Sequence, residues 1–195
     1  MKSNKASHTI SISGVILAGG LSTRMQQDKK FLKYQDKTFL DIATSNLHSA
    51  NCDSIFLSLA CPPEFPTNLN IITDELKDIG AIAGVYSVLN AKISADYLLL
   101  IPVDMPLLSP SILQNLSNNL YGNGANYKDY VFPFIIKNNL EVLNILQNLI
   151  SNKCYSLKKF LTAIASQNID ITKEDKNYLQ NINYYEQFLG LPNAK

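Results

Sequence analysis

Residues 9–20 read TISISGVILAGG, an apolar run that ends on two consecutive glycines. The part from 9 to 17 is rich in isoleucine, valine and serine, a composition that predicts a β-strand. Gly19 and Gly20 then require a turn, because glycine adopts backbone conformations that other residues avoid. The stretch therefore predicts a buried strand that runs directly into a glycine loop.

Strand and helix patterns alternate along the rest of the chain. Further strands are predicted over residues 54–60, 69–73, 97–103, 130–136 and 169–172. Helices are predicted over residues 38–49, 81–93, 109–122, 139–150 and 156–167. This alternation is typical of βαβ units with right-handed crossovers. We therefore expect an α/β fold, a three-layer sandwich with a mostly parallel, Rossmann-like sheet.

Two prolines bear on these boundaries. Pro102 lies inside the apolar run YLLLIPV at 97–103. Because proline cannot donate to a strand ladder, we expect this strand to end or bulge there. Pro110 follows Ser109, and proline at the first helical position after a serine cap predicts a helix start.

The composition limits the class of protein. The chain has 195 residues, 46% of them hydrophobic and 17% charged, with a formal net charge of +1. This balance argues against disorder and against a broad nucleic-acid surface. The three cysteines lack CxxC spacing, which argues against a disulfide framework or a zinc site. No segment has the roughly 18 apolar residues that a membrane helix needs. We therefore expect a cytoplasmic protein that binds neither nucleic acid nor membrane.

Polar residues suited to phosphate binding follow the two glycines. Consecutive glycines let backbone N–H groups approach an anion that a Cβ atom would obstruct. Ser22 adds a hydroxyl donor and Lys29 a charge, while Arg24, the only arginine, offers a fork for bidentate phosphate binding. The loop predicts a polyphosphate cradle, although it matches neither the Walker pattern nor GxGxxG. The alternative is an ordinary tight turn with polar neighbours.

Two aspartates each follow a predicted strand. Asp104 comes directly after the apolar run at 97–103, and Asp74 directly after the strand at 69–73. Open α/β sheets bind their ligands beyond the carboxyl ends of the strands. Since Mg²⁺ prefers one or two carboxylates together with phosphate oxygens and waters, Asp104 is predicted to bind Mg²⁺. The alternative is that Asp104 only caps the turn before Met105.

Several motifs together resemble one enzyme family. The run LAGGLSTRMQQDK at 17–29 resembles the signature LAGGxSxRMGxDK of the molybdenum cofactor guanylyltransferases. Asp74, GAIAG at 80–84, VDMP at 103–106 and NIN at 181–183 are similar to later motifs of that family. The resemblance is strong up to about residue 109 and weaker beyond it.

The chain departs from the family pattern at four positions. Gln26 stands where the family has glycine, Ala81 where it has proline and Val103 where it has cysteine. Ser58 stands where related enzymes carry an asparagine that touches the nucleotide, so that contact is not transferred to this chain.

The resemblance implies a Mg²⁺-dependent transfer of GMP from GTP to the phosphate of Mo-molybdopterin, with pyrophosphate as the second product. It implies catalytic roles for Arg24, Lys29 and Asp104, with Mg²⁺ bound at Asp104. The implied nucleotide-binding residues are Leu17, Ala18, Gly19, Gly20, Ser22, Lys29, Asp74, Gly84 and Asp104.

One candidate boundary divides the chain into a nucleotide-binding part and a smaller C-terminal part. Residues 1–195 would form one domain, in which about 1–121 bind the nucleotide and about 122–195 bind molybdopterin. The boundary would lie in the stretch YGNGANYK at 121–128. Partner proteins would be those that make the molybdenum cofactor or accept it.

Three alternatives remain open. The chain could be another nucleotidyltransferase, either a molybdopterin cytidylyltransferase or an enzyme that activates sugar phosphates. In the molybdopterin enzymes LAGG resembles the guanine-using branch and LAAG the cytosine-using one, so Gly19 and Gly20 favour GTP. The chain could instead be a non-catalytic nucleotide-binding protein that delivers the cofactor, or a purely structural α/β interaction module.

Overall fold

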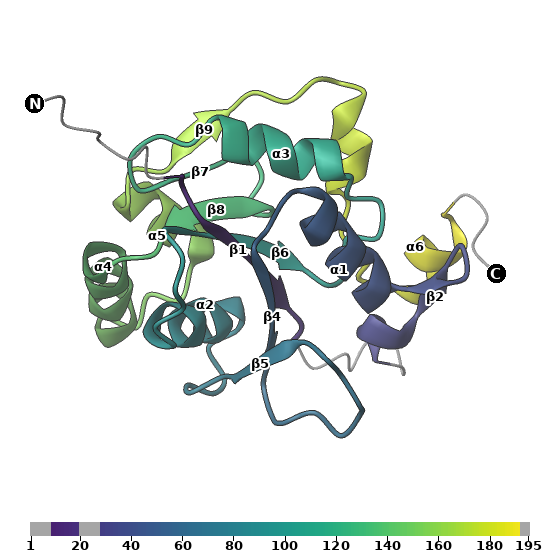
Figure 1. Ribbon diagram of the computed structural model, residues 1–195, viewed down its shortest axis with the longest axis horizontal. Helices are drawn as coiled ribbons and strands as arrows, with labels where there is room; N and C mark the ends of the chain where they lie inside the picture. Colours follow the sequence, from purple (N-terminus) through teal and green to yellow (C-terminus); the bar gives the residue numbers. More distant parts are fainter. Residues whose placement is uncertain (1–8, 20–27, 192–195) are drawn as a thin grey trace, which may run out of the picture.

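A mixed β-sheet forms the centre of the molecule and carries helices on both faces (Figure 1). The computed structural model describes residues 9–19 and 28–191. Within these residues the sheet has seven strands in the order β5-β4-β1-β6-β8-β7-β9. Their bounds are β1 Ile12–Leu17, β4 Ser54–Leu59, β5 Asn70–Thr73, β6 Tyr97–Pro102, β7 Gly124–Tyr127, β8 Phe134–Lys137 and β9 Gln167–Ile169.

The helices form the two outer layers. They are α1 Phe39–Ser49, α2 Ala81–Asn90, α3 Pro110–Asn118, α4 Leu140–Ser151, α5 Leu157–Ala163 and α6 Tyr185–Leu189. One core contains buried side chains of α1, α3 and α6, and the opposite core contains those of α2, α4 and α5. The sheet lies between the two cores, which confirms the predicted three-layer α/β sandwich.

Strand β6 shows why the sheet is buried on both faces. Leu99 and Ile101 belong to the core of α1, α3 and α6, whereas Leu98 and Leu100 belong to the opposite core. All four side chains are at most 1% exposed. Because successive strand residues point to opposite faces, a continuous apolar run fits a central strand covered by helices on each side.

The strand directions determine where a ligand can bind. β1 pairs in parallel with β4 and β6, and β4 pairs in parallel with β5. The chain order therefore reverses at β1, which is the switch point where open α/β sheets bind ligands. Beyond β6 the strand β8 is antiparallel to both β6 and β7, while β7 and β9 are parallel.

Several elements of the fold are short. The 3-10 helix η1 spans Lys29–Phe31, and a hairpin of β2 Lys33–Tyr34 and β3 Lys37–Thr38 leads into α1. A second 3-10 helix, η2, spans Asp175–Leu179. Thr38 caps α1 through a reciprocal capping box with Asp41, which explains why the helix begins at Phe39.

Some sequence-based boundaries in the C-terminal half are wrong. β7 was not predicted as a strand, and its four residues are all buried. β8 begins at Phe134 instead of residue 130, and α5 ends at Ala163 instead of 167. β9 comes earlier than the strand expected at 169–172. Sheet pairing on both sides of β7 outweighs the low strand propensity of its glycine and asparagine.

The two proline expectations have different outcomes. β6 ends at Pro102, as predicted. Helix α3 begins at Pro110, as predicted, but the Ser109 side chain makes no capping hydrogen bond. Its hydroxyl lies 2.9 Å from the hydroxyl of Ser111 instead. The helix also ends at Asn118, before the expected 122.

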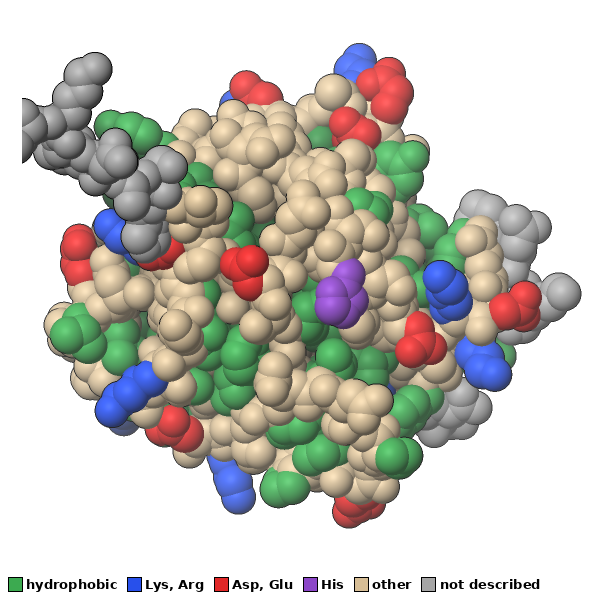
Figure 2. Space-filling view, in the orientation of Figure 1, with side chains coloured by type: hydrophobic (Ala, Val, Ile, Leu, Met, Phe, Trp, Pro, Cys, Tyr) green, Lys and Arg blue, Asp and Glu red, His purple; other side chains and the backbone are tan. Residues whose placement is uncertain are grey.

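The surface carries charges of both signs. On the face shown in Figure 2, lysines and acidic side chains are interspersed. No helix within residues 9–19 and 28–191 is long and apolar enough to cross a membrane.

Candidate active site

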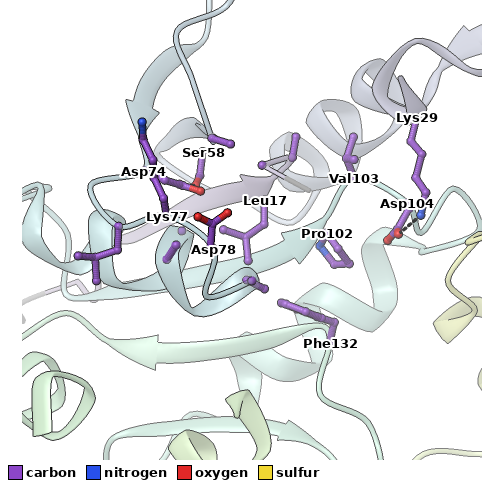
Figure 3. Close-up of a pocket in the computed structure, with 18 of the residues that line it drawn as sticks. Leu17, Lys29, Ser58, Asp74, Lys77, Asp78, Pro102, Val103, Asp104 and Phe132 are labelled. Carbon is purple, nitrogen blue, oxygen red and sulfur yellow. Dashed lines mark hydrogen bonds and ion pairs between the residues drawn. The ribbon is translucent and has the colours of Figure 1, made fainter. Parts of the chain in front are cut away.

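A cavity of about 480 Å³ opens at the carboxyl edge of the parallel strands (Figure 3). Its walls come from the residues that follow β1, β4, β5 and β6 and from the start of α2. Figure 3 shows Asp74, Ser58 and Leu17 toward one end, with Lys29 and Asp104 at the other. The cavity therefore lies at the switch point of the sheet.

A network of polar contacts surrounds Asp104 at one end of this cavity. The ammonium of Lys29 donates to Oδ2 of Asp104 at 2.8 Å, and the amide of Asn181 donates to Oδ1 at 2.8 Å. Lys29 also donates to Oδ1 of Asn183 at 3.0 Å. The backbone N–H of Ile182 donates to the carbonyl of Asp104 at 2.8 Å. The C-terminal segment is thus held directly against the end of β6.

A second carboxyl group lies at the other end of the cavity. Ser58, at the end of β4, donates its hydroxyl to Oδ1 of Asp74 at 2.9 Å. Burial raises the pKa of the Asp74 carboxyl, and the hydrogen bond from Ser58 partly offsets that rise. The two carboxyl groups therefore differ in environment: Asp104 contacts an ammonium group, whereas Asp74 contacts a neutral hydroxyl.

Two glycines make this end of the cavity possible. A Cβ atom on Gly19 would lie 2.7 Å from Oδ2 of Asp74 and 3.1 Å from the backbone nitrogen of Ala60. A Cβ atom on Gly84 would lie 2.8 Å from the Ser58 hydroxyl. At both positions a side chain would crowd its neighbours, which must shift to accept it.

The comparison with known families identifies the family to which the chain belongs. Residues 14–163 match the family described as the MobA-like NTP transferase domain. The chain belongs to that family. The protein is therefore a nucleotidyltransferase, and the resemblance inferred from its LAGG motif is confirmed.

Named relatives cover nearly the whole chain. The molybdenum cofactor guanylyltransferase of Xanthomonas euvesicatoria is 28% identical over 92% of this chain and 93% of its own length. A probable molybdenum cofactor guanylyltransferase of Natranaerobius thermophilus is 28% identical over 93% of this chain and 89% of its own length.

A solved structure supports the fold. The molybdopterin-guanine dinucleotide biosynthesis protein A of Archaeoglobus fulgidus superposes with a TM-score of 0.72 at 17% identity. The match covers 89% of this chain and 93% of that one. At this identity the likeness establishes the α/β sandwich of this nucleotidyltransferase and nothing about its substrates.

The fold brings most of the predicted site residues to one cavity. Those that line it are Leu17, Ala18, Gly19, Lys29, Asp74, Gly84 and Asp104. Gly20, Ser22 and Arg24 lie outside the described residues. Ligand binding and catalysis by any of these residues stay predictions.

Other residues of the cavity carried no separate signal in the sequence. Phe132 lines it from the turn before β8, and Lys77 and Asp78 line it from the segment between β5 and α2. Asn181 was marked only by its similarity to the NxN motif, which did not indicate its contact with Asp104. The contact of Asn181 with Asp104 joins residues 77 positions apart in the chain.

The chemistry of Asp104 suits a magnesium ion. No group of three or more His, Cys, Asp or Glu side chains that could hold a metal occurs in the described part of the chain. Mg²⁺ needs only one or two carboxylates when phosphate oxygens and waters complete its shell. The carboxylate of Asp104 has about four acceptor positions, and Lys29 and Asn181 occupy two of them. This residue therefore fits the role of a magnesium ligand.

Proposed function

We propose that this nucleotidyltransferase transfers GMP from GTP to the terminal phosphate of Mo-molybdopterin. The observation that carries the proposal is the contact of Lys29 with Asp104 in the same cavity as Gly19 and Asp74. A cation and a metal-binding carboxylate then lie beside a surface that the backbone can offer to a nucleotide. The guanylyltransferase names of the relatives that match over most of this chain support the choice of GTP and molybdopterin.

The proposed reaction is one in-line displacement. An oxygen of the acceptor phosphate attacks the α-phosphorus of GTP and forms a new P–O bond. The bond from that phosphorus to the oxygen that bridges to the β-phosphate breaks, and pyrophosphate leaves with the bonding electrons. Such chemistry requires mainly that the protein positions the two substrates and stabilises charge.

Different residues of the cavity would bind the nucleoside and the phosphates of GTP. Leu17, Ala18, Gly19, Asp74 and Gly84 would hold the nucleoside, because they surround the end of the cavity away from the Lys29 ammonium. The two glycines leave room at this end of the cavity, because a Cβ atom at either position would lie within 3 Å of a neighbouring side chain.

The phosphates would lie at the end of the cavity where Lys29 contacts Asp104. Lys29 would neutralise charge on the phosphates, together with Gly20, Ser22 and Arg24 from the glycine loop. Asp104 would hold Mg²⁺, which when bound would draw negative charge from the phosphate oxygens. Asn181 donates to the Asp104 carboxylate and so fixes its orientation.

The two substrates would use different parts of the chain. Residues 1 to about 121 contain the nucleotide end of the cavity, and residues from about 122 to 195 would bind molybdopterin within the same domain. Asn181, which touches Asp104, would then lie where the two substrates meet. Proteins that make or accept the molybdenum cofactor would supply the acceptor and receive the product.

Pyrophosphate release tests this function. GTP, CTP, ATP and UTP are each supplied with Mg²⁺, with and without molybdopterin and with and without EDTA. The proposal expects release from GTP alone, which requires molybdopterin and stops with EDTA. Release from CTP would make the enzyme a cytidylyltransferase. If a sugar phosphate is supplied in place of molybdopterin and pyrophosphate is released, the acceptor is a sugar phosphate.

Two further outcomes would remove the catalytic proposal. GTP binding without any turnover would favour a delivery protein. A melting temperature that no nucleotide raises would favour an interaction module. A bound ligand at 100 times its dissociation constant adds about 2.7 kcal/mol to stability, so the two outcomes differ measurably.

A further inference from the structure

The cavity contains one aromatic side chain among its described residues, and we infer that this side chain, Phe132, is the stacking face for a planar heterocycle of a substrate. The heterocycle is a fused 2-amino-4-oxopyrimidine, the ring that guanine and pterin share. The inference rests on the proposed function for the identity of these two sources.

The topology explains how Phe132 reaches the site. β8 runs antiparallel to β6, and Leu100 pairs with Phe134. Continuing this register by two residues places Phe132 opposite Pro102, the last residue of β6. A residue that precedes an antiparallel strand is thereby brought to the edge where the parallel strands end. Figure 3 shows Phe132 close to Pro102, which pairs with Leu17 on the neighbouring strand β1.

The ring of Phe132 is supported from the core. It stacks on the ring of Phe134, with centroids 5.3 Å apart and an interplanar angle of 28°. Phe134 is fully buried, whereas Phe132 is half-buried and lies between the two hydrophobic cores. A ring that is packed from behind and open to a cavity is pre-organised for a ligand, because little freedom is lost on binding.

The charges of the cavity favour the same conclusion. The charged side chains that line the cavity suit phosphates, metal and hydroxyl groups, but none of them offers a flat ring for stacking. They are Asp28, Lys29, Asp74, Lys77, Asp78 and Asp104. An aromatic side chain covers such a surface by stacking, which recurs where proteins bind bases. Phe132 is adjacent to Pro102, whose ring adds apolar surface to the same wall. The cavity thus combines a polar end for the phosphates with an aromatic wall for a heterocycle.

Binding titrations with Phe132→Leu and Phe132→Tyr test the inference. Leucine keeps apolar volume and removes the flat ring, whereas tyrosine keeps the ring. The probes are GTP, ribose 5-triphosphate, which has no base, and 6-hydroxymethylpterin. Phe65→Leu, a half-buried phenylalanine that does not line the cavity, is the matched control.

We expect Phe132→Leu to weaken a heterocyclic probe about tenfold, equivalent to 1.4 kcal/mol. Its affinity for ribose 5-triphosphate should stay within twofold, which also shows that the variant is folded. Phe132→Tyr and Phe65→Leu should resemble the wild type. Loss of GTP affinity identifies guanine as the stacked ring, and loss of pterin affinity identifies the acceptor.

The inference is overturned by any of four results. These are no change for either heterocycle, equal losses in the leucine and tyrosine variants, an equal loss for ribose 5-triphosphate, and a wild type that binds neither heterocycle. The titrations need no turnover. A failure to transfer GMP would therefore refute the proposed function alone, and an unchanged affinity would refute the stacking role alone.

Discussion

The ammonium of Lys29 lies 2.8 Å from Oδ2 of Asp104, although 75 residues separate them in the chain. Lys29 begins η1, just after the glycine loop, and Asp104 follows β6. Both side chains are 15% exposed, so water screens their attraction only in part. The ion pair joins the exit of the loop to the edge of the central strand, where the proposed chemistry takes place.

Substitution of Asp104 should lower the activity and leave the stability nearly unchanged. Asp104→Asn removes the carboxylate charge but keeps the shape of the side chain. We expect the rate of GMP transfer to fall about 100-fold or more. The partly exposed ion pair contributes only about 1 kcal/mol to folding, so the urea midpoint should change little. Asp129→Asn, at an exposed turn position before β8, is the control and should keep full activity. An Asp104 variant that keeps its activity would remove this residue from the site.

Substitution of Gly84 should destabilise the protein, against the usual trend. An alanine in place of a helical glycine normally stabilises by about 1 kcal/mol. Here the new Cβ would lie 2.8 Å from the Ser58 hydroxyl and 3.0 Å from Cδ2 of Leu17. We expect Gly84→Ala to lower the free energy of unfolding by about 1–3 kcal/mol.

A second substitution tests the cause of that loss. Ser58→Ala removes the hydroxyl against which the new methyl group would collide. The double variant should regain part of the stability that Gly84→Ala loses relative to wild type, as measured by urea unfolding. If Ser58→Ala worsens the Gly84 variant instead, the close approach is not the cause.

The buried carboxyl of Asp74 should make stability depend on pH. Burial raises its pKa above the ordinary value of 3.8, so the folded state binds the proton more tightly than the unfolded state. Its contribution to stability is complete below 3.8 and is lost as the pH rises through the folded-state pKa.

Asp74→Asn tests this dependence without removing the acceptor of the Ser58 hydrogen bond. The variant should be more stable than the wild type at pH 7, and the difference should shrink as the pH falls toward 4. Urea unfolding of both proteins between pH 4 and 8 measures the difference. A wild type that gains on the variant as the pH rises would show the opposite sign and refute the assignment.

The three cysteines should react with a thiol reagent at different rates. Cys61 is exposed, Cys154 is half-buried and Cys52 is buried. Burial, together with the charge of Asp53, raises the pKa of the Cys52 thiol to about 12. Because only the thiolate reacts, Cys52 should stay protected at pH 8 until the protein unfolds.

A colorimetric thiol titration measures these rates. Cys61→Ser should abolish the fast phase, and urea should then expose two thiols. A fast phase that persists in this variant would mean that the packing around another cysteine is looser than the structure indicates.

Much of the parallel half of the sheet could be predicted from local sequence. The strands β1, β4 and β6 are apolar runs buried on both faces. Such runs can be recognised in the sequence without knowledge of tertiary contacts. β7 could not be predicted, since GANY has the composition of a loop. Its burial comes from pairing with β8 and β9, which the local sequence does not encode. The antiparallel direction of β8 could not be predicted from the local sequence either.

The site shows the same division between local and distant information. Asp74 and Asp104 could be predicted to line one cavity, because each follows a strand and parallel strands end at one edge. The contact of Asn181 with Asp104 spans 77 residues and depends on how the C-terminal segment folds back. Phe132 was missed for a similar reason, since only the antiparallel register of β8 brings it beside Pro102.

Transfer of label from GTP tests the central claim most directly. Wild-type protein is incubated with Mg²⁺ and molybdopterin, once with GTP labelled at the α-phosphate and once with GTP labelled at the γ-phosphate. The account predicts that the α label appears in a molybdopterin dinucleotide and the γ label in pyrophosphate. If the α label stays in GTP or appears as free GMP without the dinucleotide, the chain is not a guanylyltransferase acting on this acceptor.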